Sequence, residues 1–157
     1  MDEVNDLLYE KLPEDKFISL IYAIYDADEQ VLTYAVGGHP EGLVYRPRTD
    51  EIFKIKTEGS LVGVVPTDVA EFEEQRIQLE PGDRLLFYTD AVIEVLVDED
   101  EAFGSERLES FFRENHAQPI DECINTLYDH VLSSTVRESI NDDVTLIGME
   151  ILEKTTS

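Results

Sequence analysis

The chain has 157 residues, of which 36 are Asp or Glu and 12 are Lys or Arg, so its formal net charge is −24. Nucleic acids and anionic membranes both attract clustered Lys and Arg, so this charge argues against either as a partner. No run of about 18 apolar residues occurs that would span a membrane. The acidic first residues also differ from the basic start of a secretory signal. Composition therefore predicts a soluble, cytoplasmic protein.

The hydrophobic content of 42% is enough for a folded core, unlike that of acidic disordered tails. No repeat, low-complexity stretch or linker divides the sequence, so we expect a single domain over residues 1–157. Cys123 is the only cysteine, which excludes an intrachain disulfide and a cysteine-based zinc site within one chain. With Ile124 and Leu127 nearby, Cys123 is expected to be a small buried side chain.

The first half of the chain is expected to form one helix and five short strands. Apolar residues recur at helical spacing from Val4 to Leu12, and Pro13 ends this helix. Segments rich in β-branched and aromatic residues, separated by turns, predict strands over 17–25, 31–36, 42–46, 51–56 and 70–79. The first two of these strands are expected to form a hairpin.

The second half is expected to be mainly helical between two strands. Residues 84–89 are a nearly continuous apolar run, which is typical of a strand buried on both faces. Helical spacing follows over 91–97, Ser105 can cap a second helix, and a longer helix begins near Ile120. The last strand is expected over 143–152. This order predicts an α+β fold, with helices on a largely antiparallel sheet.

Two carboxylates are singled out by their position. Asp90 stands where the buried strand turns into a helix, and Asp142 immediately precedes the last strand. Two carboxylates held at the ends of neighbouring strands can bind Mg²⁺ or Mn²⁺, which prefer oxygen ligands. Spacing leaves a second interpretation open for each carboxylate. For Asp90 the alternative is a helix N-cap, and for Asp142 and Asp143 it is a turn before the strand.

Other site motifs are less informative. Asp98 begins a segment like an EF-hand loop, but Ala102 replaces the third ligand, and the required Gly and Glu do not follow. No P-loop and no Gly-x-Ser-x-Gly elbow occur. His39 lies on a loop between two glycines and Pro40. Its ring either bonds a backbone group to shape the turn or lies beside a site.

Six segments together carry a family pattern. They are 17–26, 34–40, 59–63, 79–94, 103–108 and 141–145. The most specific part is Pro-Gly-Asp followed by Tyr-Thr-Asp-x-x-x-Glu, then Phe-Gly, then Asp-Asp-x-Thr. In order and spacing these segments resemble the bacterial metal-dependent Ser/Thr phosphatases of the PPM (PP2C-like) class, in the branch of the sporulation stage II protein E and the sigma-B regulators.

The resemblance implies an α/β/β/α sandwich of largely antiparallel sheets covered by helices. It implies hydrolysis of phosphoserine or phosphothreonine at a binuclear Mn²⁺ or Mg²⁺ centre, with Asp90 and Asp142 as metal ligands and His39 and Asp143 adjacent to the site. Water activated by the metals would replace a protein nucleophile, so no catalytic side chain is expected. The implied partners are phosphorylated proteins of the anti-anti-sigma type in partner-switching pathways.

The chain departs from the family pattern at several positions. Ala91 replaces the Gly that usually follows the aspartate, and Val36-Gly37 replaces the usual Asn-Ala. Nothing before Phe17 matches the family's upstream Gly-Asp-x-x-Asp strand and Asp-Val-x-Gly-x-Gly loop, which supply further groups to the metals. The chain is therefore expected to hold roughly the C-terminal two thirds of the family fold and part of the metal centre.

Two functions follow from these observations. In the first, the chain is a phosphatase unit whose metal centre is completed by an N-terminal segment from elsewhere. In the second, it is a catalytically silent module that binds a phosphoprotein or a regulator. An incomplete sandwich also exposes a strand edge and an apolar face, which predicts a homo-oligomer.

Overall fold

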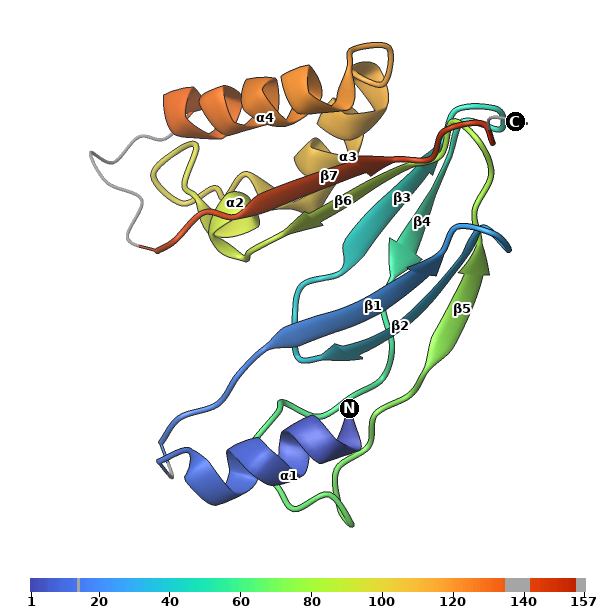
Figure 1. Ribbon diagram of the computed structural model, residues 1–157. Coiled ribbons are helices and arrows are strands. Elements are labelled where there is room, and N and C mark those ends of the chain that lie inside the picture. The colour runs from blue at the N-terminus through green and yellow to red at the C-terminus, as the bar shows by residue number, and fades with distance from the viewer. Residues whose placement is uncertain (14, 135–141, 155–157) are drawn as a thin grey trace. The chain divides into compact units, whose positions relative to one another are not determined.

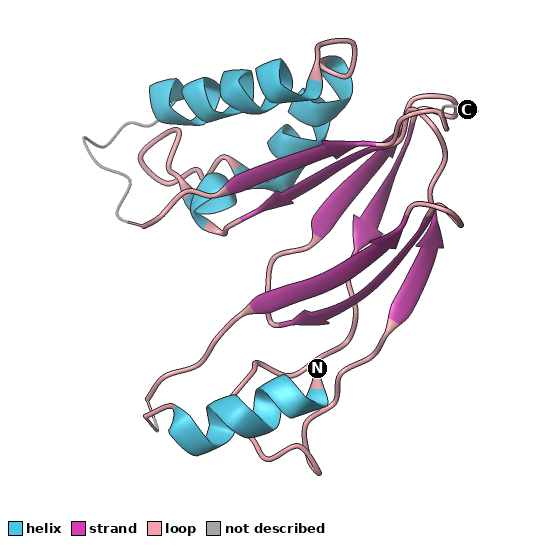
Figure 2. Ribbon diagram, viewed as in Figure 1, coloured by secondary structure: helices cyan, strands magenta, loops and turns pink. Residues whose placement is uncertain are grey.

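The computed structural model describes residues 1–13, 15–134 and 142–154. The chain forms two compact units. Unit 1 comprises Met1–Pro40 and Ile55–Leu79, and unit 2 comprises Glu41–Lys54 and Glu80–Ser157. Figure 1 labels the helices and strands, and Figure 2 colours them by type. That the two units make up one domain over 1–157 stays a prediction.

Unit 1 contains one helix and a three-stranded sheet. Its elements are α1 (Asp2–Lys11), β1 (Leu20–Asp26), β2 (Val31–Gly37) and β5 (Gln75–Gln78). The strand order is β1-β2-β5, and β2 pairs antiparallel with both neighbours (Figure 1). The predicted hairpin is therefore present. Its register runs without interruption from Leu20 opposite Gly37 to Asp26 opposite Val31.

A buried asparagine joins α1 to the loop that precedes β5. The side chain of Asn5 is completely buried. Its Nδ2 donates to the carbonyl of Val65 (3.0 Å) and to the hydroxyl of Thr67 (2.9 Å), and its Oδ1 accepts the N–H of Gly63 (2.8 Å). Because a buried amide is costly unless it is hydrogen-bonded, these three bonds hold the loop against α1.

Unit 2 contains a four-stranded sheet and three helices. Its strands are β3 (Gly42–Arg46), β4 (Glu51–Ile55), β6 (Arg84–Tyr88) and β7 (Leu146–Glu150), in the order β4-β3-β6-β7. Its helices are α2 (Ala91–Glu94), α3 (Gly104–Glu114) and α4 (Ile120–Ser134). β6 pairs antiparallel with β3 and β7, and the helices lie on one side of this sheet (Figure 1). No helix among the described residues has both the length and the apolar composition needed to cross a bilayer.

Alternate residues of the central strands pack against the helices. Leu43 of β3 and Leu86 of β6 belong to this core. Its members from the helical region are Val92, Val95, Phe103, Leu108, Phe112, Cys123, Leu127 and Val131. Leu85, the neighbour of Leu86, is also fully buried, as expected for a strand buried on both faces. Cys123 is buried as predicted, and burial raises the pKa of its thiol.

A buried cation connects the start of β6 to the end of α3. The side chain of Arg84 is only 2% exposed. Its Nη1 donates to the carbonyl oxygens of Asn115 (3.2 Å) and His116 (2.6 Å), which follow the last turn of α3. Positive charge is favoured at this end of a helix, so Arg84 fixes α3 to the sheet.

The predicted elements are all present in the described part of the chain, but several boundaries differ. The strand expected over 70–79 is limited to β5, because only these residues pair with β2. The helix expected over 91–97 ends at Glu94, where Val95 turns to a ψ of 130°. Helix α3 begins at Gly104 without a side-chain cap, so the prediction that Ser105 caps it is wrong.

Candidate functional site

Two strand ends meet at one edge of the unit 2 sheet. The last pair of the β6–β7 ladder is Tyr88 opposite Leu146. Asp90 follows Tyr88 by two residues, and Asp142 and Asp143 lie just before β7. β6 and β7 are thus neighbours, as the prediction of a shared cation site required (Figure 1).

The side chain of Thr89 links these two strand ends. Its Oγ1 accepts the N–H of Thr145 (3.0 Å) and donates to the carbonyl of Asp143 (2.9 Å). The backbone N–H of Thr89 donates to the carbonyl of Thr145 (3.2 Å). Because a side chain takes part in this bonding, β7 begins at Leu146 and not at 143 as predicted. The bonds restrain the backbone directly beside Asp90 and close to Asp142.

Asp90 is the N-cap of α2, which was one of the two roles left open. Its Oδ1 accepts the N–H of Ala91 (2.9 Å), and its carbonyl accepts the N–H groups of Ile93 and Glu94 (both 2.9 Å). The side chain is exposed, and the described residues place no hydrogen-bond donor on Oδ2. Capping therefore orients the carboxylate through Oδ1.

Asp142 and Asp143 form a local turn before β7. The Oδ1 of Asp142 accepts the N–H of Asp143 (2.8 Å), and both side chains are exposed. The turn that the sequence left open is therefore present. Asn141, the first residue of the predicted Asn-Asp-Asp motif, lies outside the described residues. As at Asp90, one carboxylate oxygen of Asp142 bonds the backbone, and the other has no bond within the described chain.

The groups at this edge suit a hard divalent cation in type but are few in number. Mg²⁺ and Mn²⁺ prefer oxygen ligands, and Mg²⁺ commonly takes one or two carboxylates together with water and substrate phosphate. Across residues 1–13, 15–134 and 142–154, no three His, Cys, Asp or Glu side chains gather as a metal site. That Asp90 and Asp142 are metal ligands stays a prediction.

The charged groups near the end of β6 are paired with one another. The Nζ of Lys54 lies 3.0 Å from Oε2 of Glu41 and 3.2 Å from Oε1 of Glu109. Burial raises the pKa of the Tyr88 hydroxyl, and the negative charge of Glu41 raises it further, while Lys54 lowers it. Tyr88 is therefore neutral at physiological pH and adds no charge beside Asp90.

His39 belongs to unit 1 and lies on the loop after β2, as predicted. Its Nδ1 lies 3.1 Å from the Oγ of Ser19. The expected partner was a backbone group, so this detail of the prediction is wrong. The loop turns at Gly38, whose φ of +65° favours glycine. A role for His39 beside the metal site stays a prediction.

Sequence reasoning missed Thr89 and Thr145. Both stand in the motifs that were recognised, Tyr-Thr-Asp and Asp-Asp-x-Thr, but only groups able to ligate a metal were considered there. The useful signal was a threonine at each of the two strand ends that carry a candidate carboxylate. A hydroxyl can donate and accept at once, so it can bond across the ends of two antiparallel strands.

The fold is that of PP2C-like phosphatase domains. The RsbU and RsbW domains of Rv1364c from Mycobacterium tuberculosis superpose with a TM-score of 0.78 at 26% identity, covering 96% of this chain and 41% of that one. The phosphatase domain of SpoIIE from Bacillus subtilis, in crystals presoaked with Mn, gives a TM-score of 0.72 at 17% identity, covering 96% and 64%. The predicted fold class, with helices and antiparallel sheets, is confirmed.

The family model of Stage II sporulation protein E (SpoIIE) matches residues 1–152, and the chain belongs to this family. Phosphoserine phosphatase RsbU of Bacillus subtilis (strain 168) is 25% identical over 148 residues, which are 94% of this chain and 43% of that protein. The chain spans less than half the length of the curated relatives it matches. The resemblance drawn from the sequence motifs is thus confirmed.

Proposed function

We propose that this chain is a metal-dependent phosphatase domain that hydrolyses phosphoserine or phosphothreonine in a protein. The observation that supports the proposal is that β6 and β7 are paired neighbours, with Asp90 following the end of β6 and Asp142 preceding the start of β7. Membership in the SpoIIE family and similarity to a protein named phosphoserine phosphatase support it.

In this proposal, Asp90 and Asp142 hold Mn²⁺ or Mg²⁺. The bound cation would lower the pKa of a water molecule and bind phosphoryl oxygens, so that no protein nucleophile is needed. The chain itself would orient the two carboxylates that bind the cation. The Asp90 carboxylate is directed by its bond to Ala91, that of Asp142 by its bond to Asp143, and Thr89 holds the two backbones together.

For the substrate, we propose a phosphorylated protein of the anti-anti-sigma type in a partner-switching pathway of the cytoplasm. The support is similarity to RsbU and to a structure that contains RsbU and RsbW domains. A protein substrate also agrees with the net charge of −24, which disfavours nucleic acid.

A second candidate is a module that binds a phosphoprotein or regulator without turnover. The observation in its favour is that the described residues gather fewer than three metal-binding side chains. The two candidates differ in whether a cation at Asp90 and Asp142 supports hydrolysis, so one set of measurements separates them.

The decisive experiment is hydrolysis of p-nitrophenyl phosphate and of a phosphoserine peptide by the 157-residue chain, with MnCl₂ and with EDTA. The phosphatase proposal expects turnover that requires Mn²⁺. Asp90→Asn and Asp142→Asn should each lower it at least about 100-fold, the upper end of the losses seen when groups around metal ligands are removed. Asp129→Asn, at an exposed position of α4, is the matched control and should keep wild-type turnover.

Absence of turnover would contradict the phosphatase proposal for this chain. If calorimetry then shows binding of the phosphoserine peptide but not of unphosphorylated peptide, the silent module is supported. If neither peptide binds, both candidates are wrong. Turnover that survives both aspartate substitutions would place the metal elsewhere.

A further inference from the structure

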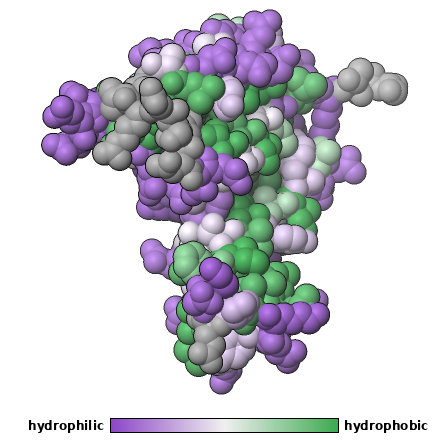
Figure 3. Space-filling model, turned by 90° about the vertical axis from the view of Figure 1, so that its left-hand side faces the viewer, coloured by the Kyte–Doolittle hydropathy of each residue, from purple (hydrophilic) through white to green (hydrophobic). Residues whose placement is uncertain are grey.

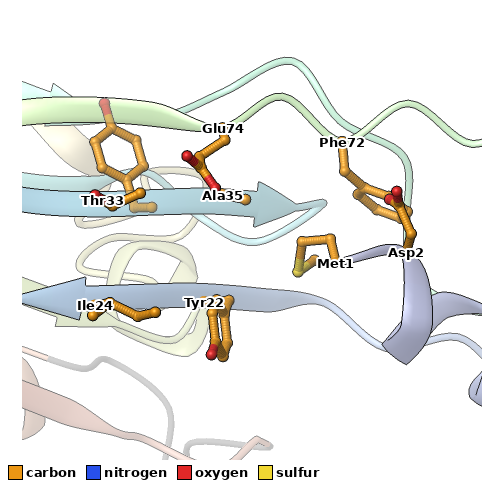
Figure 4. Close-up of a pocket in the computed structure, with 9 residues that line it drawn as sticks. Met1, Asp2, Tyr22, Ile24, Thr33, Ala35, Phe72 and Glu74 are labelled. Atoms are coloured by element: carbon orange, nitrogen blue, oxygen red, sulfur yellow. The ribbon is translucent and has the colours of Figure 1, made fainter.

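Helices α3 and α4 of unit 2 form an open groove. It has a volume of about 510 Å³, and its wall is made by residues of α3, by Asn115 at the end of α3 and by His130 of α4. The hollow of about 220 Å³ in unit 1, by contrast, has Met1 and Asp2 in its wall (Figure 4). The groove of unit 2 is thus built from described residues in the interior of the chain.

Two glutamates lie on the α3 side of the groove. Glu106 and Glu114 share one face of α3 with Ser110, because residues four apart in a helix are neighbours on its surface. All three are exposed, and neither glutamate forms an ion pair with another described residue. Eight residues of helix separate the two glutamates by about 12 Å along the axis.

Arg107 is the one described residue of the groove wall that carries a permanent positive charge, and its guanidinium is engaged elsewhere. It pairs with Glu101, and its Nη1 donates to the carbonyls of Ala102 (2.8 Å) and Phe103 (3.1 Å). It therefore does not neutralise the two glutamates of the groove. Figure 3 shows mainly hydrophilic residues at the top of the view, where α4 lies.

Two aromatic rings in the groove wall connect α3 to α4. The imidazole of His130 stacks on the ring of Phe111, with the centroids 5.3 Å apart and an interplanar angle of 26°. A second contact, edge to face with the buried Phe103 (5.7 Å, 68°), holds the imidazole in this position. Because His130 is exposed, a flat aromatic surface lies beside the two glutamates.

We propose that this groove binds arginine side chains of a basic partner protein. Charge and shape together select this occupant. A glutamate can accept two parallel hydrogen bonds from a guanidinium, and the same planar group stacks on an aromatic ring. A lysine ammonium supplies the charge but neither the paired bonds nor the planar stacking. The proposal is independent of metal binding and of phosphatase activity.

The spacing of the two glutamates suits two arginines that are four residues apart in an extended segment. Each extended residue adds about 3.3 Å, so four residues span about 13 Å, close to the separation of the glutamates along α3. The net charge of −24 would also attract such a partner at long range.

The test is fluorescence anisotropy of a dye-labelled peptide, Arg-Gly-Ser-Gly-Arg, titrated with the complete chain at about 0.1 M NaCl, where exposed ion pairs are only partly screened. The matched peptide Lys-Gly-Ser-Gly-Lys has the same charge and spacing. The arginine peptide should bind at least about threefold more tightly, because only a guanidinium forms paired bonds and stacks. Absence of binding, or equal binding of the two peptides, overturns the proposal.

Substitution of the glutamates tests the place of binding. Glu106→Gln and Glu114→Gln should each weaken binding of the arginine peptide about two- to fivefold, the effect of losing an exposed ion pair. Glu122→Gln, at an exposed position of α4 outside the groove wall, makes the same change of charge and should leave the affinity unchanged. An equal loss in all three variants would show general attraction to an acidic chain and overturn the proposal.

Phe111→Leu tests the stacking contribution. It keeps an apolar side chain but removes the ring, so the preference for the arginine peptide over the lysine peptide should fall about two- to fivefold. Circular dichroism checks that the variant folds, since Phe111 also packs against the core. An unchanged preference in the folded variant would contradict stacking in the groove.

Light scattering distinguishes a partner protein from a second copy of this chain. The wild type and Glu106→Gln should have the same mass at every protein concentration, because the arginines come from another protein. A mass that rises above 17.9 kDa with concentration in the wild type but not in Glu106→Gln would make a second copy the occupant and overturn the proposal.

Discussion

At the scale of single residues, the hydroxyl of Thr89 links the two strand ends of the proposed site. It bonds the backbone of β6 to the segment that enters β7, and the candidate ligands lie beside these bonds. In the proposal Thr89 is a positioning residue, because it is not itself a metal ligand. Its effect should therefore appear in both stability and metal affinity.

We expect Thr89→Val to lower the free energy of unfolding by about 1–3 kcal/mol, because the N–H of Thr145 and the carbonyl of Asp143 lose their partner. The affinity for Mn²⁺ should fall about 10–100-fold, as when other groups that orient metal ligands are removed. Urea unfolding and calorimetric titration with MnCl₂ measure the two effects.

Two further variants make this prediction specific. Thr89→Ser keeps the hydroxyl and should restore Mn²⁺ affinity. Thr126→Val removes the bond from Thr126 to the carbonyl of Glu122 on α4 (2.8 Å) and should not change it. Equal Mn²⁺ affinity of the wild type and Thr89→Val would contradict a positioning role.

At the scale of elements, the turn before β6 is held by a buried ion pair. Asp83 is fully buried, and its carboxylate accepts bonds from Nε (3.0 Å) and Nη2 (2.7 Å) of Arg46 at the end of β3. It also accepts the N–H of Glu80 (2.8 Å). The aspartate of the Pro-Gly-Asp motif thus joins two strands, and the bond to Asp83 raises the pKa of Arg46.

Asp83→Ala is expected to lower the free energy of unfolding by about 3–5 kcal/mol, because it leaves the largely buried Arg46 without its main partner. Asp68→Ala, at an exposed position, should cost less than about 0.5 kcal/mol. Urea unfolding of both variants is the measurement. If Asp83→Ala costs no more in the wild type than in an Arg46→Met background, the ion pair does not stabilise the turn.

At the scale of the whole molecule, stability should depend on pH in the alkaline range. Burial raises the pKa of Tyr34, Tyr45 and Tyr88 above the ordinary value of 10.0. In the unfolded chain these hydroxyls lose their protons near pH 10, while in the folded chain they keep them. The unfolded state then binds fewer protons, so stability is constant with respect to these groups below that pH and falls above it.

Urea midpoints measured between about pH 8 and 11 test this expectation, with ultraviolet absorbance reporting the loss of the tyrosine proton near pH 10. Tyr88→Phe should make the alkaline decrease shallower, because it removes one of the linked protons. Tyr128→Phe, at an exposed position of α4, is the control and should keep the wild-type slope. An unchanged midpoint across this range would contradict the linkage.

Much of the fold could be predicted from local pattern. Apolar periodicity located all the helices and strands described here, and the nearly continuous apolar run at 84–89 correctly predicted a strand buried on both faces. The motifs identified the family. The positions of Asp90 and Asp142 followed from the rule that a carboxylate at a strand end is held at the sheet edge. These features depend on residues close together in the sequence.

Tertiary structure alone decided which groups meet across the chain. The β6–β7 register brings Thr89 to Asp143 and Thr145, and β3–β6 packing brings Arg46 to Asp83. Asn5 looks like an ordinary surface residue in the sequence, yet it is buried and hydrogen-bonded. Asn115 and His116, the hydrogen-bond partners of Arg84, lie 31 and 32 residues further along the chain. Periodicity reports which side chains are apolar, whereas the partner of a buried polar group is set by the path of distant segments. The sequence therefore determined the class of the protein, and the packing decided which residues support its proposed site.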